Sequence, residues 1–480
     1  MFIGKKVHSR RTVAPRMAVL LSATAGLLCA DILVVFTRAG SVGMVIALVA
    51  MVALVIELRR MALEFLEQPG PQRWWRVLRA ATEMLLYLSP IAMLSIAYPI
   101  ASHRLDTTEV GGVRLTTLLL AASVTVPWLT QAVCLPLYRA VAPHVAAEEH
   151  DKINERLCEV WPTTFVQCLP VIVLFAVPME ISQHWSPTAL ATYLCLCVLY
   201  VAFAQSLILS IIFRRRGLWA VAWAGVALAL LVAPSVWFLP PLVGLATQLL
   251  PLWRHRALLM RRVRLQYADV AQDTVRGLLL GAVLWSDKYF LFLKDGNRFA
   301  VTTVYMALLP AVLAYNYYFV RLAPRFDASI IELRRAMEEA PYTILVRRSR
   351  AVYQFVTRSL YRSALVGAAI AVIVTVLIGA LRPGSVALAA AVAVASWLAM
   401  MMTLLCYQLD YIGQSRIAQV LSAVYLVGCA AAFAFLPAVA APYVALIAFD
   451  VLLCALTLRT TLEHWRSPEY SLFWRHATAW

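Results

Sequence analysis

Long runs of apolar residues, separated by short polar segments, occupy most of the chain. A helix needs about 20 mostly apolar residues to cross a bilayer, and the pattern predicts fourteen such spans. The least secure division lies at Pro234, which leaves two short spans, and the most polar span is 274–293. The predicted spans are 17–36, 41–57, 84–102, 115–137, 161–181, 189–213, 218–233, 235–253, 274–293, 299–320, 364–381, 386–409, 417–436 and 443–462.

The basic residues gather in every second loop between these spans. With a cytoplasmic N-terminus, the inner segments hold 33 of the 42 lysines and arginines, and the outer loops hold six. Positive charge marks the cytoplasmic side of a membrane protein, so we expect both termini in the cytoplasm. The formal net charge of +17 is then a consequence of topology, and nucleic acid is not an expected partner.

Composition agrees with the pattern of spans. The chain is 62% hydrophobic and 14% charged, whereas soluble globular proteins are nearer one half and one quarter. This excludes a water-soluble enzyme and predicts an all-α polytopic membrane protein. The first apolar run is a full-length span with no small-residue cleavage site after it, so we expect a retained helix rather than a signal peptide.

The order of loops and spans repeats along the chain. The segment LYRAVAP (137–143) resembles VRLAPRF (320–326), and each opens a basic linker followed by four closely spaced spans. This predicts two six-helix bundles, 84–269 and 270–480, as parallel pseudo-repeats preceded by two extra helices in 1–83. Two such bundles with a cleft between them are typical of a transporter.

The linker 321–363 is amphipathic and basic. Apolar residues recur in it at helical spacing, which predicts a helix lying on the anionic inner leaflet and joining the two halves. The alternative is a docking surface for a cytoplasmic partner. The apolar stripe consists of Phe326, Ile330, Leu333 and Met337, and the exposed cations would include Arg334, Arg335, Arg347 and Arg348.

Charged residues inside a predicted span are the main candidates for function, because charge in the membrane is costly. Arg276 and Asp287 are eleven residues apart and share one helix face, which we expect to line the cleft. Lys288 adjoins Asp287 and could pair with it. In the alternative, Asp273 and Arg276 lie at the inner interface and the Asp287–Lys288 pair reaches outward to solvent. Asp450 and Asp31 are further single acids within spans.

Polar aromatic residues form a second group of candidates. Tyr315 and Asn316 follow the mid-span Pro310 and belong either to an interfacial aromatic belt or to a sugar-binding surface. The sequence contains no glycine-rich phosphate loop and no cluster with metal-ligand spacing, so we expect no catalysis, cofactor or metal.

The segment GLLLGAVLWSDKYFLF (277–292) places Trp285, Asp287 and Lys288 in an aromatic–x–Asp–Lys pattern. This pattern is similar to a motif of the Pel exopolysaccharide exporter family, within the flippase superfamily of multidrug, lipid II and O-antigen exporters. Pro310 followed by the linker RFDASIIELRRAMEE, the inner turn LLCYQLDYIGQSRIAQVLSAVYL (404–426) and SPEYSLFWRH (467–476) resemble further family features. The family's glycine-rich opening motif is replaced by Leu88-Ser89-Pro90.

The resemblance implies export of a growing or lipid-linked polysaccharide across the bacterial cytoplasmic membrane. The expected partners are a cytoplasmic glycosyltransferase, other membrane subunits of a polysaccharide synthase, and membrane lipids. One alternative is a cation-coupled antiporter of the same fold, with Asp287 or Asp450 as the coupling carboxylate. Another is a non-transporting scaffold that recruits a synthase through the linker.

Overall fold

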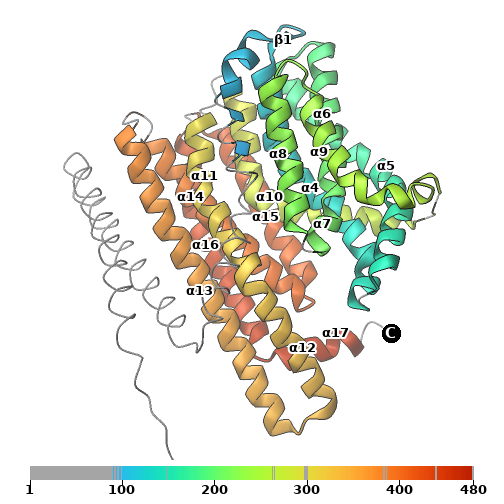
Figure 1. Cartoon of the computed structure of the whole chain (residues 1–480). Coiled ribbons are helices and arrows are strands. Elements are labelled where there is room, and N and C mark those ends of the chain that lie inside the picture. Colours follow the sequence, from blue (N-terminus) through green and yellow to red (C-terminus); the bar gives the residue numbers. More distant parts are fainter. Residues whose placement is uncertain are drawn as a thin grey trace, which may run out of the picture. The chain divides into compact units, whose positions relative to one another are not determined.

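The computed structural model describes residues 90–477, apart from 91–92, 95–96, 99, 148, 214, 262, 264, 297–300, 382–383, 385 and 438–439. The predicted spans 17–36 and 41–57, with Asp31, lie outside the described residues, as does most of 84–102. The described chain is almost wholly helical (Figure 1). A short antiparallel hairpin, β1 (Glu109–Val110) and β2 (Val113–Arg114), precedes the long helices.

The helices follow one another with short connections. They are α4 (Leu115–Ala146), α5 (His150–Gln183), α6 (Pro187–Ser206), α7 (Ile208–Ile212), α8 (Arg216–Val232), α9 (Leu239–Leu249), the 3₁₀ turns η1 (Leu250–His255) and η2 (Leu258–Met260), α10 (Tyr267–Asp295), α11 (Val301–Tyr317), the π-helical turn η4 (Tyr318–Leu322), α12 (Ala323–Glu339), α13 (Tyr342–Leu381), α14 (Val386–Tyr411), α15 (Ser415–Phe435), α16 (Ala440–Trp465) and α17 (Pro468–Ala477).

Seven of these helices, in the described part of the chain, are long and apolar enough to cross a membrane. The all-α membrane class predicted from the sequence is therefore confirmed, whereas the number of fourteen spans and the repeat stay predictions. Helix α10 is 29 residues long, or about 43 Å at 1.5 Å per residue. Its length would suffice to cross a bilayer, but its charged residues set it apart from the seven.

The chain forms two compact units. The α10 unit comprises Glu83–Val301, Met402–Trp465 and Tyr470–Trp480, and the α13 unit includes Thr302–Met401 and Arg466–Glu469. Helix α10 therefore belongs to the same unit as the helices that precede it, although the sequence pattern placed it at the start of a second bundle.

The apolar region 218–253 forms two helices of unequal length. Helix α8 has 17 residues, the chain turns at 233–238, and α9 has only 11 residues. A helix of 11 residues is about 16 Å long, well short of the roughly 30 Å hydrocarbon core. The division at Pro234 is confirmed, but the predicted span 235–253 is not a continuous α-helix of membrane-crossing length.

The linker 321–363 folds as a helical hairpin within the α13 unit. Phe326, Ile330 and Leu333 of α12 are buried, and so are Val352 and Val356 of α13, where the two helices pack together. Periodicity identified the buried face of α12 correctly, and that face packs within the protein. The position of the hairpin on the inner leaflet stays a prediction. Helix α13 then continues to Leu381 without interruption.

Two glycines allow α10 to pack closely against α4. A Cβ atom at Gly277 would lie 2.3 Å from the carbonyl oxygen of Gln131, and one at Gly281 would lie 2.8 Å from the carbonyl oxygen of Trp128. This small-xxx-small spacing permits backbones in a membrane to approach. The Trp128 indole adds a hydrogen bond of 2.8 Å to the carbonyl oxygen of Leu278. One face of α10 is thus fixed against α4.

Candidate functional site

Helix α10 carries an acid and a base into the protein interior. Asp287 is 0% exposed and Lys288 1% exposed, although neighbouring residues on a helix project about 100° apart. The lysine side chain folds back, so that its Nζ lies 2.9 Å from Asp287 Oδ2 and donates a hydrogen bond of 3.2 Å to the carbonyl oxygen of Leu284. The alternative in which this pair reaches outward to solvent is wrong.

The ion pair leaves the carboxylate of Asp287 incompletely satisfied. The contact with Lys288 has the distance of an ion pair, and among the described residues neither oxygen of Asp287 has a hydrogen-bond partner of good geometry. A buried ionised group without hydrogen bonds is costly. Such an arrangement is uncommon where it serves stability alone.

Asp450 of α16 is the third buried ionisable group. It is 2% exposed, and within the described part of the chain neither of its carboxylate oxygens has a hydrogen-bond partner. Its charge interacts with those of Asp287 and Lys288. Two acids and one base, all ionised, would carry a net charge of −1 in a region largely closed to water.

Helices α15 and α16 complete this group. Tyr425 and Cys429 are four residues apart on α15, and Tyr443 and Asp450 are seven apart on α16, so each pair occupies one helix face. All four side chains are buried and interact electrostatically with Asp287. Gly428 allows α15 to approach the Phe449 ring of α16.

We call Asp287, Lys288 and Asp450, with Tyr425, Cys429 and Tyr443, the buried charge cluster. Sequence analysis identified the three charged members but missed the two tyrosines and the cysteine. Tyrosines within apolar helices are common in protein cores, so the sequence does not mark Tyr425 and Tyr443 as functional. Only the packing of α15 and α16 with α10 shows which side chains they face.

A second group of ion pairs lies nearer the start of α10. Arg276 pairs with Asp410 at the end of α14, and Asp273 pairs with Arg139 of α4 at 3.1 Å. Arg276 and Asp410 are partly exposed. Since Arg276 precedes Asp287 by eleven residues, the two groups are about 16 Å apart along the helix. The structure therefore gives Arg276 and Asp287 separate partners.

The remaining residues predicted as site candidates lie outside the buried charge cluster and differ in exposure. Trp285 is half-buried on α10. Tyr315 and Asn316 are half-buried on α11 in the α13 unit, where the Tyr315 ring lies 4.6 Å from that of Phe319. In the α12–α13 hairpin, Arg348 contacts Glu332 at 3.3 Å. Arg335, Arg347 and Arg348 are exposed and Arg334 is half-buried.

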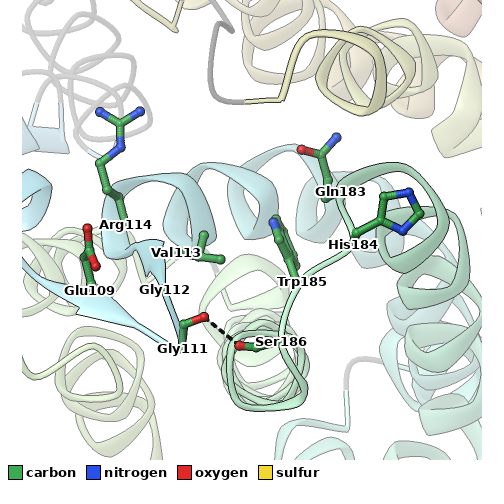
Figure 2. A pocket seen from close by; sticks show the side chains of 9 residues that line it. All are labelled: Glu109, Gly111, Gly112, Val113, Arg114, Gln183, His184, Trp185 and Ser186. Atoms are coloured by element: carbon green, nitrogen blue, oxygen red, sulfur yellow. Dashed lines mark hydrogen bonds between the residues drawn. The ribbon is translucent and has the colours of Figure 1, made fainter.

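A polar pocket of about 580 Å³ lies beside the β1–β2 hairpin, at the start of α6. Figure 2 shows Glu109 and Arg114 from the hairpin and Gln183, His184 and Trp185 from the end of α5 around it. Ser186 donates a hydrogen bond of 2.7 Å to the carbonyl oxygen of Gly111, which closes one side.

Backbone conformation shapes this pocket. Gly111 has φ +59°, and a Cβ there would lie 2.1 Å from Ser186 Oγ. His184 ends α5 with φ +50°, a left-handed conformation that a non-glycine residue rarely adopts. The pocket offers both signs of charge, an amide and an imidazole to a polar ligand. Sequence analysis missed it, because its residues come from two loops about 70 positions apart.

Comparison with known proteins gives no relative: no family, no curated protein and no solved structure matches this chain.

Proposed function

We propose that this protein is a transporter that moves an exopolysaccharide or a lipid-linked saccharide across the bacterial cytoplasmic membrane. It would act with a cytoplasmic glycosyltransferase and other membrane subunits of a polysaccharide synthase. The apolar helices support a membrane transporter in general terms. The polysaccharide substrate rests on the resemblance of 277–292 to the Pel exopolysaccharide exporter family, and the inner-membrane location rests on the distribution of basic residues.

The buried charge cluster is the observation that carries this proposal. Asp287 and Asp450 are closed to water and lack hydrogen-bond partners among the described residues. Replacing buried ion pairs by apolar residues is often neutral or stabilising, so stability alone does not explain why this chain keeps three ionisable groups there. Intramembrane charges of this kind mark ion and substrate pathways.

The polar pocket near β1 and β2 also fits a saccharide exporter. Planar polar side chains such as Glu109, Arg114 and Gln183 suit the vicinal hydroxyls of sugars. The predicted topology places this pocket on the outer side, where an exported chain would emerge.

The proposal is tested by measuring cell-surface polysaccharide in a deletion strain complemented with different variants. Asp287→Asn is expected to abolish the polymer while the protein remains in the membrane at wild-type level. Glu463→Gln is the matched control, since Glu463 is an exposed acid on α16 paired with Arg459 at 2.9 Å, and it should restore the polymer fully. Unchanged polymer in the deletion strain would refute the exporter.

The net charge of the cluster favours a second candidate, a cation-coupled antiporter. One proton or one Na⁺ would neutralise two acids facing a single base, which is the requirement for a coupling site. Uptake of a small cationic substrate that depends on pH or on Na⁺, and that fails in Asp450→Asn, would support this candidate. The exporter predicts no such uptake.

The exposed arginines of the α12–α13 hairpin favour a third candidate, a scaffold that recruits a synthase. A scaffold would tolerate Asp287→Asn and would fail when Arg335, Arg347 and Arg348 are neutralised together. The same complemented strains therefore separate all three candidates.

A further inference from the structure

The segment between α9 and α10 combines exposed apolar and exposed basic side chains. Leu250, Trp253 and Met260 are 65% to 88% exposed, which is unusual for three large apolar residues within eleven positions. Arg254 on η1 is exposed, and so are Arg256 and Arg261, which directly follow η1 and η2. We call these six residues the Arg254 patch. Large apolar residues beside arginine are typical of a surface that lies at a membrane interface.

The cations of this patch are only partly neutralised. Arg261 lies 3.8 Å from Glu159 of α5, which also pairs with Arg156 at 3.5 Å. Among the described residues neither Arg254 nor Arg256 has an acidic partner, and the Arg256 guanidinium lies 4.7 Å from the centre of the Trp253 ring. Two guanidinium groups therefore remain available to bind an anion bidentately.

An apolar groove adjoins the patch. It has a volume of about 240 Å³ and is lined by Trp161, Pro162, Phe165, Ala202, Leu249 and Leu259. Leu249 directly precedes the patch and Leu259 lies within it, and the other four residues come from α5 and α6. We call it the Trp161 groove. Its lining offers almost no hydrogen-bonding group to a polar ligand, so a hydrocarbon chain suits it.

The segment is held in place against α5. Thr163 donates a hydrogen bond of 3.2 Å to the carbonyl oxygen of Val263, and Leu252 of η1 is buried. At the end of α9, Gln248 donates to the carbonyl oxygen of Leu218 at 3.1 Å. These contacts hold the groove and the segment that carries the arginines in one arrangement, so the site is formed before a ligand binds.

We propose that the Arg254 patch and the Trp161 groove bind one anionic phospholipid of the cytoplasmic leaflet. The phosphate would lie on Arg254 and Arg256, and part of an acyl chain would occupy the groove. Charge complementarity selects an anionic headgroup over a zwitterionic one, and the groove selects a lipid over a soluble phosphate. The proposal depends on the membrane class of the protein and is independent of what it transports.

The test is native mass spectrometry of the purified full-length protein titrated with phosphatidylglycerol or phosphatidylcholine of the same chains. Wild type should retain phosphatidylglycerol at least about tenfold more tightly. Since each arginine at the surface contributes about 1 kcal/mol to binding anionic lipid and 1.4 kcal/mol is tenfold, Arg254→Gln with Arg256→Gln should weaken phosphatidylglycerol about 30-fold. Phosphatidylcholine binding should not change.

Two further variants separate headgroup from chain. Arg104→Gln removes an exposed arginine from the predicted outer side and should leave lipid binding unchanged. Ala202→Phe narrows the groove and should weaken dioleoyl phosphatidylglycerol while leaving a dihexanoyl analogue unaffected. Equal retention of the two lipids, or equal loss in the Arg104 control, would overturn the proposal. Displacement by millimolar glycerol phosphate would do the same, because it would identify a soluble anion as the ligand.

Discussion

Two segments of α10 are built on opposite principles. The first carries Gly277 and Gly281, whose shared glycine face lies against the backbone of α4 with no room for a side chain. The second, about two to three turns further along the helix, carries Asp287 and Lys288, which interact electrostatically with Asp450 of α16. The glycine face contributes stability through close contact, whereas the charged segment places ionisable groups where they are costly. The difference indicates that α10 is anchored to α4 so that its charged segment can be held against α15.

The largest expected effect comes from breaking the glycine face. Gly277→Leu would drive a side chain into the carbonyl of Gln131, so the two helices would separate. We expect a loss of stability above about 5 kcal/mol, seen as absence of monodisperse protein after detergent extraction. Gly217→Leu is the control, because a Cβ at Gly217 meets nothing within 4 Å. A folded, wild-type-like Gly277→Leu protein would show that the close packing is unimportant.

A slightly smaller effect is expected from removing the only base of the buried charge cluster. Lys288→Met leaves two acids without a counter-charge, which should cost about 3–5 kcal/mol, measured as a fall in thermal unfolding temperature. The double variant Lys288→Met with Asp287→Asn restores the balance and should recover most of that loss. Additive losses in this double-mutant cycle would contradict the direct pairing of the two residues.

A third variant separates stability from function within the same cluster. Asp450→Asn removes a buried carboxyl group that lacks a hydrogen-bond partner in the described chain, so stability should be unchanged or should rise by about 1 kcal/mol. Surface polymer, or coupled uptake if the antiporter is correct, should be lost. Substitutions in functional sites often raise stability and lower activity. A variant that loses stability and keeps function would assign Asp450 a structural role.

The sequence predicted which residues of α10 would matter but not what they would meet. Apolar length identified the membrane class, and the cost of intramembrane charge drew attention to Asp287, Lys288 and Asp450. The residues that contact or face these side chains lie on helices more than 100 positions away. Periodicity within one helix does not predict which faces of different helices pack together. Tyr425 and Tyr443 therefore passed as core residues, and the Asp410 partner of Arg276 was not foreseen.

The linker and the region after Pro234 illustrate the same limit. Helical periodicity in 321–363 identified the buried stripe through Phe326, Ile330 and Leu333, but burial against α13 and burial in lipid produce the same pattern. Likewise, hydropathy marked 235–253 as apolar, whereas α9 begins only at Leu239, with Pro240 and Pro241 in its first turn, and the chain leaves the α-helix for the 3₁₀ turn η1 at Leu250. Composition measures how apolar a segment is, not where a helix ends.

The smallest effect is expected from the ion pair near the start of α10, and it sharpens the contrast between the charged groups of this helix. Arg276 and Asp410 are partly exposed, so solvent screens their attraction. In a double-mutant cycle of Arg276→Gln and Asp410→Asn, the coupling free energy between the two residues should be about 1 kcal/mol or less. Raising the salt concentration should reduce this coupling further, whereas the coupling between Asp287 and Lys288 should be insensitive to salt because both side chains are closed to water. If the two couplings had the same size and the same salt dependence, burial would not distinguish the two ends of α10, and Asp287 would lose its claim to a special role.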